Sequence, residues 1–131
     1  SLKDFKGKTV VLFFYPKDLT SGCTQEACDF RDLHAKFKKK GAVVLGVSKD
    51  SASSHEKFIA KYDLPFRLLV DDQTKVATQY GVWKEKSMYG RKYMGVVRST
   101  FVINPSGKIQ KIYDKVKVAD HAQTVLDELD V

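Results

Sequence analysis

The sequence predicts an α/β fold, a single domain whose central mixed sheet is flanked by helices. Two patterns lead to this prediction. Apolar runs of strand length alternate with segments in which apolar residues recur every three or four positions, and strands joined by helices pair in parallel. Near the end, residues 104–107 (NPSG) form a turn signal between two runs, which predicts an antiparallel hairpin. A length of 131 residues suits one domain with a core of its own.

The first half of the chain contains two expected strands and two expected helices. The runs at 9–15 (TVVLFFY) and 42–48 (AVVLGVS) are continuously apolar, which is typical of strands buried on both faces. Between them a helix begins at Cys23 and ends at Gly41, because glycine accepts the left-handed conformation. The next helix runs to about Tyr62, and its candidate caps are Ser51, Ser53 and Ser54.

The second half adds shorter elements. We expect a strand at 66–70, a brief helix at 74–80, strands at 99–103 and 108–113, and an amphipathic helix at 119–129. Residues 82–97 mix aromatics, glycines and lysines and leave their structure open. The order β-α-β-α-β-α-β-β-α is that of the thioredoxin-like fold. In open sheets of this kind the reactive group lies where a strand ends and a helix begins, and Cys23 has that place.

The position of Cys23 has chemical consequences. The first turn of a helix presents unpaired N–H groups and the positive end of the helix dipole, and both favour thiolate over thiol. A side chain here continues the apolar stripe of the helix and should face inward. Asp18, Glu26 and Asp29 oppose the thiolate, so we expect a distant arginine or lysine to complete the site.

The second cysteine, Cys28, follows five residues later on the same helix and lies off its apolar stripe. On an ideal helix this spacing gives a rise of about 7.5 Å and a rotation of about 140°, so the Cα atoms lie roughly 8 to 9 Å apart. A disulfide tolerates up to about 7 Å. A bond between the two sulfurs would therefore require the first turns of the helix to unwind.

These residues carry a resemblance to a known family. Pro16, Thr20 and Cys23 match the P-x-x-x-T-x-x-C signature of peroxiredoxins, and Cys28 resembles the subgroup called bacterioferritin comigratory protein or peroxiredoxin Q. Residues 81–103 are also similar to that subgroup, although Ser21 stands where the family commonly has proline. Members of the subgroup carry an additional N-terminal hairpin. We expect residues 1–131 to be a peroxiredoxin domain without it.

The resemblance implies a thiol-dependent peroxidase for hydrogen peroxide and organic hydroperoxides. Cys23 would attack the peroxide and become a sulfenic acid, and Cys28 would resolve it as an intramolecular disulfide. Thioredoxin or a similar dithiol would then reduce the disulfide. No haem, flavin, metal or other cofactor is implied.

Further site roles follow from the same resemblance. Thr20 would direct its hydroxyl at the peroxide and the thiolate, and Pro16 would shield the sulfur. Arg98, in an R-S-T-F setting, would give two N–H donors to the sulfur and to the developing oxyanion. The backbone N–H groups of Gly22 and Cys23 would complete the substrate site, and Glu26 would help to orient the loop.

Simpler roles are open for the same residues. Either cysteine can be a small packing residue, Thr20 a turn residue and Pro16 a loop stiffener. A thioredoxin-like disulfide oxidoreductase would share the fold, but its C-x-x-C is absent and residues 97–99 offer no proline. A third alternative is a redox-regulated binding module, in which oxidation unwinds the helix and exposes a partner surface.

Composition and residue spacing limit the kinds of partner and the cellular setting that we expect for this protein. The formal charge of +7 comes mainly from scattered lysines, so we expect no nucleic acid partner. Cys23, Cys28 and His34 lack the spacing of a metal site, and His55 and His121 show no partnering pattern. No membrane span or signal peptide is evident, so we expect a cytoplasmic protein that is a monomer or at most a weak dimer. The aromatics Trp83 and Tyr89 fit either a pocket lining or a partner interface.

Overall fold

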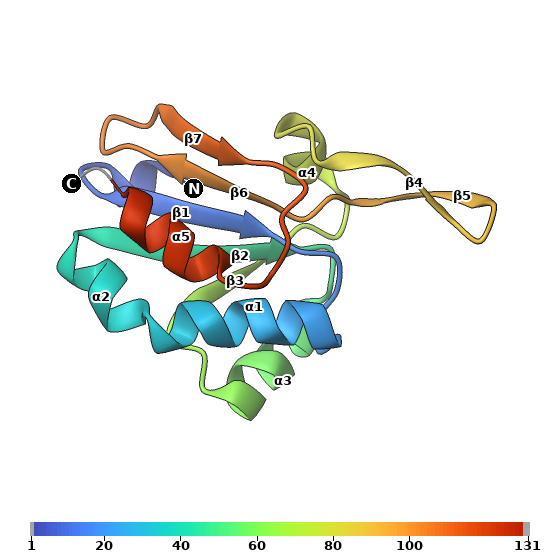
Figure 1. Cartoon of the computed structure of the whole chain (residues 1–131), viewed down its shortest axis with the longest axis horizontal. Helices are drawn as coiled ribbons and strands as arrows, with labels where there is room; N and C mark the ends of the chain where they lie inside the picture. Colours follow the sequence, from blue (N-terminus) through green and yellow to red (C-terminus); the bar gives the residue numbers. More distant parts are fainter. Residues whose placement is uncertain (1, 130–131) are drawn as a thin grey trace.

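The computed structural model describes residues 2–129, and a five-stranded mixed sheet of order β3-β2-β1-β6-β7 forms their centre (Figure 1). Its strands are β1 (Thr9–Phe14), β2 (Ala42–Ser48), β3 (Arg67–Val70), β6 (Ser99–Ile103) and β7 (Ile109–Tyr113). The first three are parallel, whereas β6 pairs antiparallel with β1 and with β7. The predicted parallel strands and antiparallel edge are thus confirmed.

Helices cover both faces of this sheet. They are the 3-10 helix η1 (Leu2–Phe5) and the α-helices α1 (Ser21–Asp32), α2 (His34–Lys39), α3 (Ala52–Tyr62), α4 (Lys75–Gln79) and α5 (His121–Glu128). One face packs against α1, α2, α3 and α5, and the other against α4 (Figure 1). This two-sided cover explains why the central strands have no polar side.

The central strand β1 supplies side chains to both cores. Val11 and Phe13 face the larger core, where the Phe13 ring stacks on Phe30 of α1 with centroids 4.8 Å apart. Leu12 and Phe14 face the core that contains α4. Successive side chains of a strand point to opposite faces, so a continuous apolar run is what this position requires.

The first predicted helix differs from the observed one at its start and in its middle. It begins at Ser21, because Thr20 is the extended residue before it and the Thr24 N–H donates to the Thr20 carbonyl. The prediction that it begins at Cys23 was therefore wrong by two residues. At Leu33 the backbone leaves the helical region, and α2 starts at the next residue. The apolar stripe continues across this break because Phe30 and Phe37 contact each other in one core.

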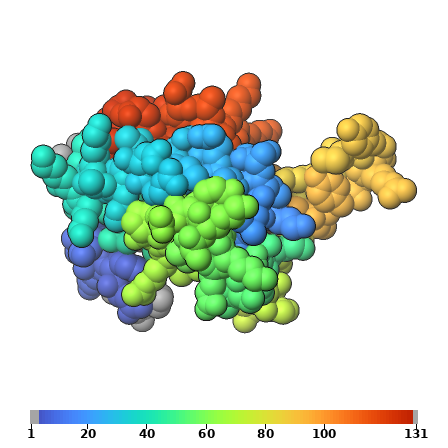
Figure 2. All heavy atoms as spheres, turned by 90° about the horizontal axis from the view of Figure 1, so that it is seen from below, coloured from blue at the N-terminus to red at the C-terminus, as the bar shows by residue number. Residues whose placement is uncertain are grey.

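The segment that the sequence left open is a β-hairpin. β4 (Trp83–Met88) and β5 (Arg91–Val96) pair antiparallel and project from the body (Figures 1 and 2). Tyr89 and Gly90 connect them with φ values of 52° and 78°. Two positive φ values in a two-residue connection are typical of a type I′ turn, whose usual sequence signal is Asn-Gly rather than Tyr-Gly.

The predicted turn and cap residues have the expected conformations. The Ser51 hydroxyl accepts from Ser54 N–H at 3.1 Å and caps α3. Gly41 is left-handed with φ 76°, and the Asn104 carboxamide oxygen accepts from Ser106 and Lys108 N–H in the β6–β7 turn. The inward positions predicted for the last helix are buried as expected; they are Ala122, Val125 and Leu126 of α5 and Leu129 directly after it.

Candidate active site

Cys23 lies in the first turn of α1, just after the loop that leaves the carboxyl end of β1. Its side chain faces the larger core and is 1% exposed, which confirms the predicted inward orientation. The first hydrogen bond of α1 runs from Thr24 N to Thr20 O. The N–H groups of Gly22 and Cys23 therefore have no acceptor within the helix. The sulfur thus lies at the positive end of α1.

Arg98 reaches this sulfur from the other end of the sequence. In the β1–β6 register Phe14 pairs with Ser99, so Arg98 precedes β6 beside the point where β1 ends. Its Nη2 donates to Cys23 Sγ at 3.3 Å, and its Nη1 donates to Glu26 Oε1 at 2.7 Å. One planar guanidinium thereby contacts both the sulfur and a carboxylate of the same helix.

Glu26 holds the other nitrogen of this guanidinium. Its side chain is 1% exposed, and burial raises the pKa of Glu26 to about 7, while the charge and hydrogen bond of Arg98 oppose that rise. Near neutral pH the carboxyl group is thus divided between its protonated and ionised forms. Glu26 therefore repels the thiolate less than a fully ionised carboxylate would. It also neutralises less of the positive charge that Arg98 presents to the sulfur.

Gly22 lies directly against the guanidinium. A Cβ atom at this position would lie 3.3 Å from Arg98 Nη2, which is closer than most Cβ contacts. The backbone of the first turn therefore approaches Arg98 as closely as the absence of a side chain allows.

The loop before α1 contains the other two predicted site residues. Thr20 is exposed, and its hydroxyl donates to the Lys17 carbonyl at 2.8 Å. Pro16 is half-buried and follows directly on Tyr15. Both residues lie within seven positions of Cys23, and their expected roles stay predictions.

Cys28 lies on the same unbroken helix as Cys23, and both are free thiols. Its side chain is half-buried. Burial raises the pKa of the Cys28 thiol, while the charge of Arg31 opposes this rise. An intact α1 keeps the two cysteines at the helical separation that no disulfide spans, so the unwinding expected from the sequence would also be needed here.

Sequence reasoning missed a second cation near the site. Lys86 of β4 is half-buried, and its pKa is lowered by burial and by the charge of Arg98, while Cys23 opposes this shift. Lys86 reaches the site because it lies on the β4–β5 hairpin, and no clear turn signal in the sequence marks that hairpin. The sequence therefore offered nothing that pointed to Lys86.

A second omission concerns Asp18, which was expected to oppose the thiolate. The structure instead pairs its buried carboxylate with His55, whose Nδ1 lies 2.7 Å from Asp18 Oδ2. The two residues are 37 positions apart, and neither stands in a recognisable pattern. The sequence shows no partnering pattern for His55, so this contact is visible only in the structure.

The remaining candidates have other surroundings. His34 is half-buried against the Phe66 ring. His121 contacts the Thr100 hydroxyl at 2.8 Å, and burial, aided by the charge of Arg98, lowers its pKa to about 4. Trp83 packs against the core that contains α4, and Tyr89 is exposed at the hairpin tip.

Residues 2–129 contain neither a metal-binding cluster nor a membrane-spanning helix. No group of three or more His, Cys, Asp or Glu side chains within this range is arranged to hold a metal ion. No helix within the same range is both long and apolar enough to cross a membrane.

The chain is similar to known proteins over almost its whole length. Residues 1–112 match the AhpC/TSA family. The chain belongs to this family. Peroxiredoxin Bcp of Bacillus subtilis is 54% identical over 128 residues, which are 98% of this chain and 82% of that protein. Putative peroxiredoxin bcp of Coxiella burnetii is 51% identical over 98% of this chain and 85% of its own length.

A solved structure agrees with this family assignment. The bacterioferritin comigratory protein of Xanthomonas campestris, studied for alkyl peroxide reduction, has a TM-score of 0.93 and 44% identity. That likeness covers 97% of this chain and 81% of the other. The predicted family, subgroup and thioredoxin-like fold are therefore confirmed.

Proposed function

We propose that this protein is a thiol peroxidase in which Cys23 is the nucleophile. The observation that carries the proposal is the 3.3 Å contact from Arg98 Nη2 to Cys23 Sγ at the positive end of α1. A thiolate is favoured where helix dipole and guanidinium both meet the sulfur. The peroxiredoxin names of the relatives support the same activity.

The first step consumes the peroxide. The Cys23 thiolate attacks one peroxide oxygen, a S–O bond forms as the O–O bond breaks, and two electrons pass from sulfur to oxygen. The leaving hydroxide or alkoxide takes up a proton and departs as water or alcohol. The guanidinium of Arg98 and the N–H groups of Gly22 and Cys23 stabilise the charge that develops on the oxygens. Thr20 orients the peroxide, and Pro16 restricts access of water to the sulfur.

The second step uses Cys28. Its thiolate attacks the sulfenic sulfur of Cys23, a S–S bond forms, and the hydroxide that leaves becomes water with one proton. The first turns of α1 unwind to allow this approach. Thioredoxin or a similar dithiol then reduces the disulfide by thiol exchange, which returns both thiols and leaves the reductant oxidised.

Stopped-flow measurement of peroxide loss tests this function. The reduced protein is mixed with a slight excess of hydrogen peroxide, and wild type is compared with Cys23→Ser and Cys28→Ser. We expect rapid loss in wild type, none above background in Cys23→Ser, and one equivalent consumed by Cys28→Ser. Slow loss in all three, at the rate of a free thiol, would refute the peroxidase and favour disulfide exchange or redox-controlled binding.

Three more specific proposals concern the reductant, the cellular location and the assembly state. We propose thioredoxin or a similar dithiol, a cytoplasmic setting and a monomer or weak dimer. Multiple turnovers in the presence of thioredoxin, thioredoxin reductase and NADPH would support thioredoxin as the reductant. Analytical ultracentrifugation of the reduced and oxidised protein measures the assembly state.

A further inference from the structure

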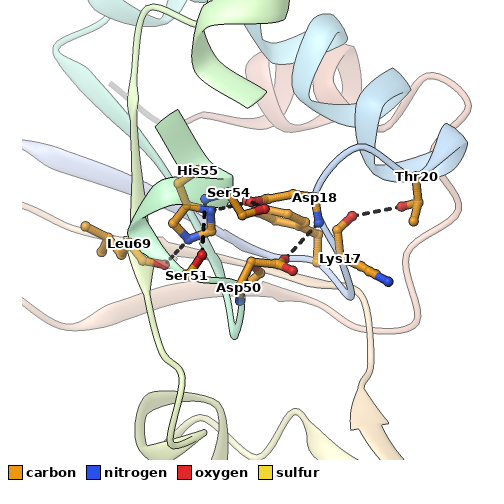
Figure 3. A network of polar contacts seen from close by, with 10 residues as sticks. Lys17, Asp18, Thr20, Asp50, Ser51, Ser54, His55 and Leu69 are labelled. Carbon is orange, nitrogen blue, oxygen red and sulfur yellow. Dashed lines mark hydrogen bonds and ion pairs between the residues drawn. The ribbon is translucent and has the colours of Figure 1, made fainter. Parts of the chain in front are cut away.

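The loop between β1 and α1 is fastened to the body by a buried polar cluster (Figure 3). Asp18 Oδ1 accepts from the Tyr15 hydroxyl at 2.5 Å, and Asp18 Oδ2 accepts from the Ser54 hydroxyl at 2.8 Å. His55 Nδ1 lies 2.7 Å from the same Oδ2, and the Asp18 N–H donates to Asp50 Oδ2 at 2.8 Å. We call these five residues the loop clamp.

The contacts of His55 determine its protonation. Nε2 lies 3.0 Å from the Leu69 carbonyl oxygen, which can only accept a hydrogen bond. Burial would raise the pKa of Asp18, but hydrogen bonds from His55, Tyr15 and Ser54 hold it below its usual value. The Asp18 group is therefore a carboxylate and also only accepts. Both ring nitrogens of His55 must donate, so the ring is an imidazolium.

The surroundings of His55 favour this charge. The charged groups that face it are Asp18 from the loop and Asp50 from the segment before α3, and both are acidic. The neighbouring polar groups are the Tyr15 hydroxyl just after β1, the Ser54 hydroxyl of α3 and the Leu69 carbonyl of β3. Burial lowers the pKa of His55, but the Asp18 contacts, the carbonyl and Asp50 raise it above the ordinary value.

The loop beyond Asp18 is held much less firmly. Leu19 is exposed and has φ 63°, a left-handed conformation that costs energy for a residue with a side chain. The Thr20 hydroxyl bonds within the same loop, and it makes no capping bond to α1. The firmly held and weakly held parts of the chain therefore meet between Asp18 and Leu19.

We propose that the Asp18–His55 pair positions Cys23 by fixing where the unwinding of α1 stops. Residues up to Asp18 stay with the body, and the segment that opens for the Cys23–Cys28 disulfide begins at Leu19. The clamp thereby holds Cys23 beside Arg98 for reaction with peroxide and opposes the opening that disulfide formation needs. This proposal rests on the proposed function of the two cysteines.

Two rate constants test this role in variants. Asp18→Asn and His55→Gln weaken the clamp, and Glu56→Gln changes an exposed residue next to His55 as the control. Stopped-flow measurements separate sulfenic acid formation, which depends on peroxide concentration, from disulfide formation, which does not. We expect the clamp variants to slow the first step at least tenfold and to speed the second at least threefold. A merely structural defect would slow both steps, and that result, or unchanged rates, would overturn the proposal.

The wild-type protein provides tests that do not depend on variant folding. In hydrogen–deuterium exchange, oxidation should remove protection from residues 24–30, whose N–H groups are bonded in α1, and leave it at Tyr15 and Asp18. Imidazole NMR should show His55 mostly doubly protonated at pH 6.5 in the reduced protein, with the charge lost as pH rises through its elevated pKa. Even loss of protection from 15 to 30, or a mostly neutral His55 at pH 6.5, would refute the clamp. Peroxide consumption that survives Cys23→Ser would instead refute the proposed function.

Discussion

Replacing Arg98 by lysine should separate the charge of this residue from its geometry. The guanidinium contacts Cys23 Sγ through Nη2 at 3.3 Å and Glu26 Oε1 through Nη1 at 2.7 Å. A lysine ammonium has one nitrogen at a single point and does not reproduce this fork. We expect that nitrogen to stay with the buried carboxylate, because the contact to Glu26 is the shorter one. The sulfur then loses its side-chain donor.

The size of the effect follows from this one lost contact. A hydrogen bond that involves a charged group contributes about 1.5 to 3 kcal/mol. Because each 1.36 kcal/mol of activation free energy is about tenfold in rate, sulfenic acid formation should slow by about 10- to 150-fold. The effect should appear in the rate of the chemical step, since the net charge of the site is unchanged.

The assay is single-turnover peroxide consumption at pH 7 by wild type, Arg98→Lys and Arg91→Lys. Arg91 is exposed on β5, so its replacement is a matched control with the same chemical change. We expect Arg91→Lys to stay within twofold of wild type. An Arg98→Lys rate within threefold of wild type, with an intact circular dichroism spectrum, would show that a positive charge suffices and that the fork is irrelevant.

Three further predictions concern Glu26, Gly22 and Phe30. Burial raises the pKa of Glu26 from 4.5 to about 7, so this group makes folding less favourable as pH rises from about 4.5 to 7. Glu26→Gln should therefore stabilise the fold by about 2 kcal/mol more at pH 8 than at pH 5 in urea titrations; an equal effect at both would contradict the shifted pKa. Gly22→Ala should slow peroxide reduction by about 3- to 10-fold by displacing Arg98, while the better helix residue raises stability by up to about 1 kcal/mol; a rate equal to wild type would show that Arg98 adjusts freely. Phe30→Ala should lower the free energy of unfolding by about 3 to 5 kcal/mol, against less than about 0.5 for the exposed Tyr89→Ala, and equal losses would refute the core assignment.

Local chemistry explains why much of this protein is predictable from its sequence. The apolar runs of β1 and β2 are buried on both faces, Gly41 is left-handed, and Ser51 caps α3. Each of these features depends on a residue and its immediate neighbours. The inward orientation of Cys23 follows in the same way from the stripe of α1.

The errors have a common origin in interactions that the local sequence does not contain. The two-residue shift in the start of α1 depends on the extended backbone of Thr20, which no side-chain cap marks. The β4–β5 hairpin went unrecognised because its Tyr-Gly turn takes two positive φ values with tyrosine in the first place. The turn propensity of Tyr89 and Gly90 is a weak guide here, because the pairing of β4 with β5 along their whole length determines the conformation of the turn.

By itself, the sequence determined the order of the elements outside the α1–α2 break and the β4–β5 hairpin, the place of Cys23 in the first turn of a helix, and the family resemblance, because these depend on residue type and spacing. Only the tertiary structure decided which charges meet. The register of β6 on β1 brings Arg98 to Cys23 across 75 positions, and α3 brings His55 to Asp18 across 37. Burial raises the pKa of Glu26, whereas the contacts with Asp18 raise that of His55 against the effect of burial, and these influences exist only once the chain has folded.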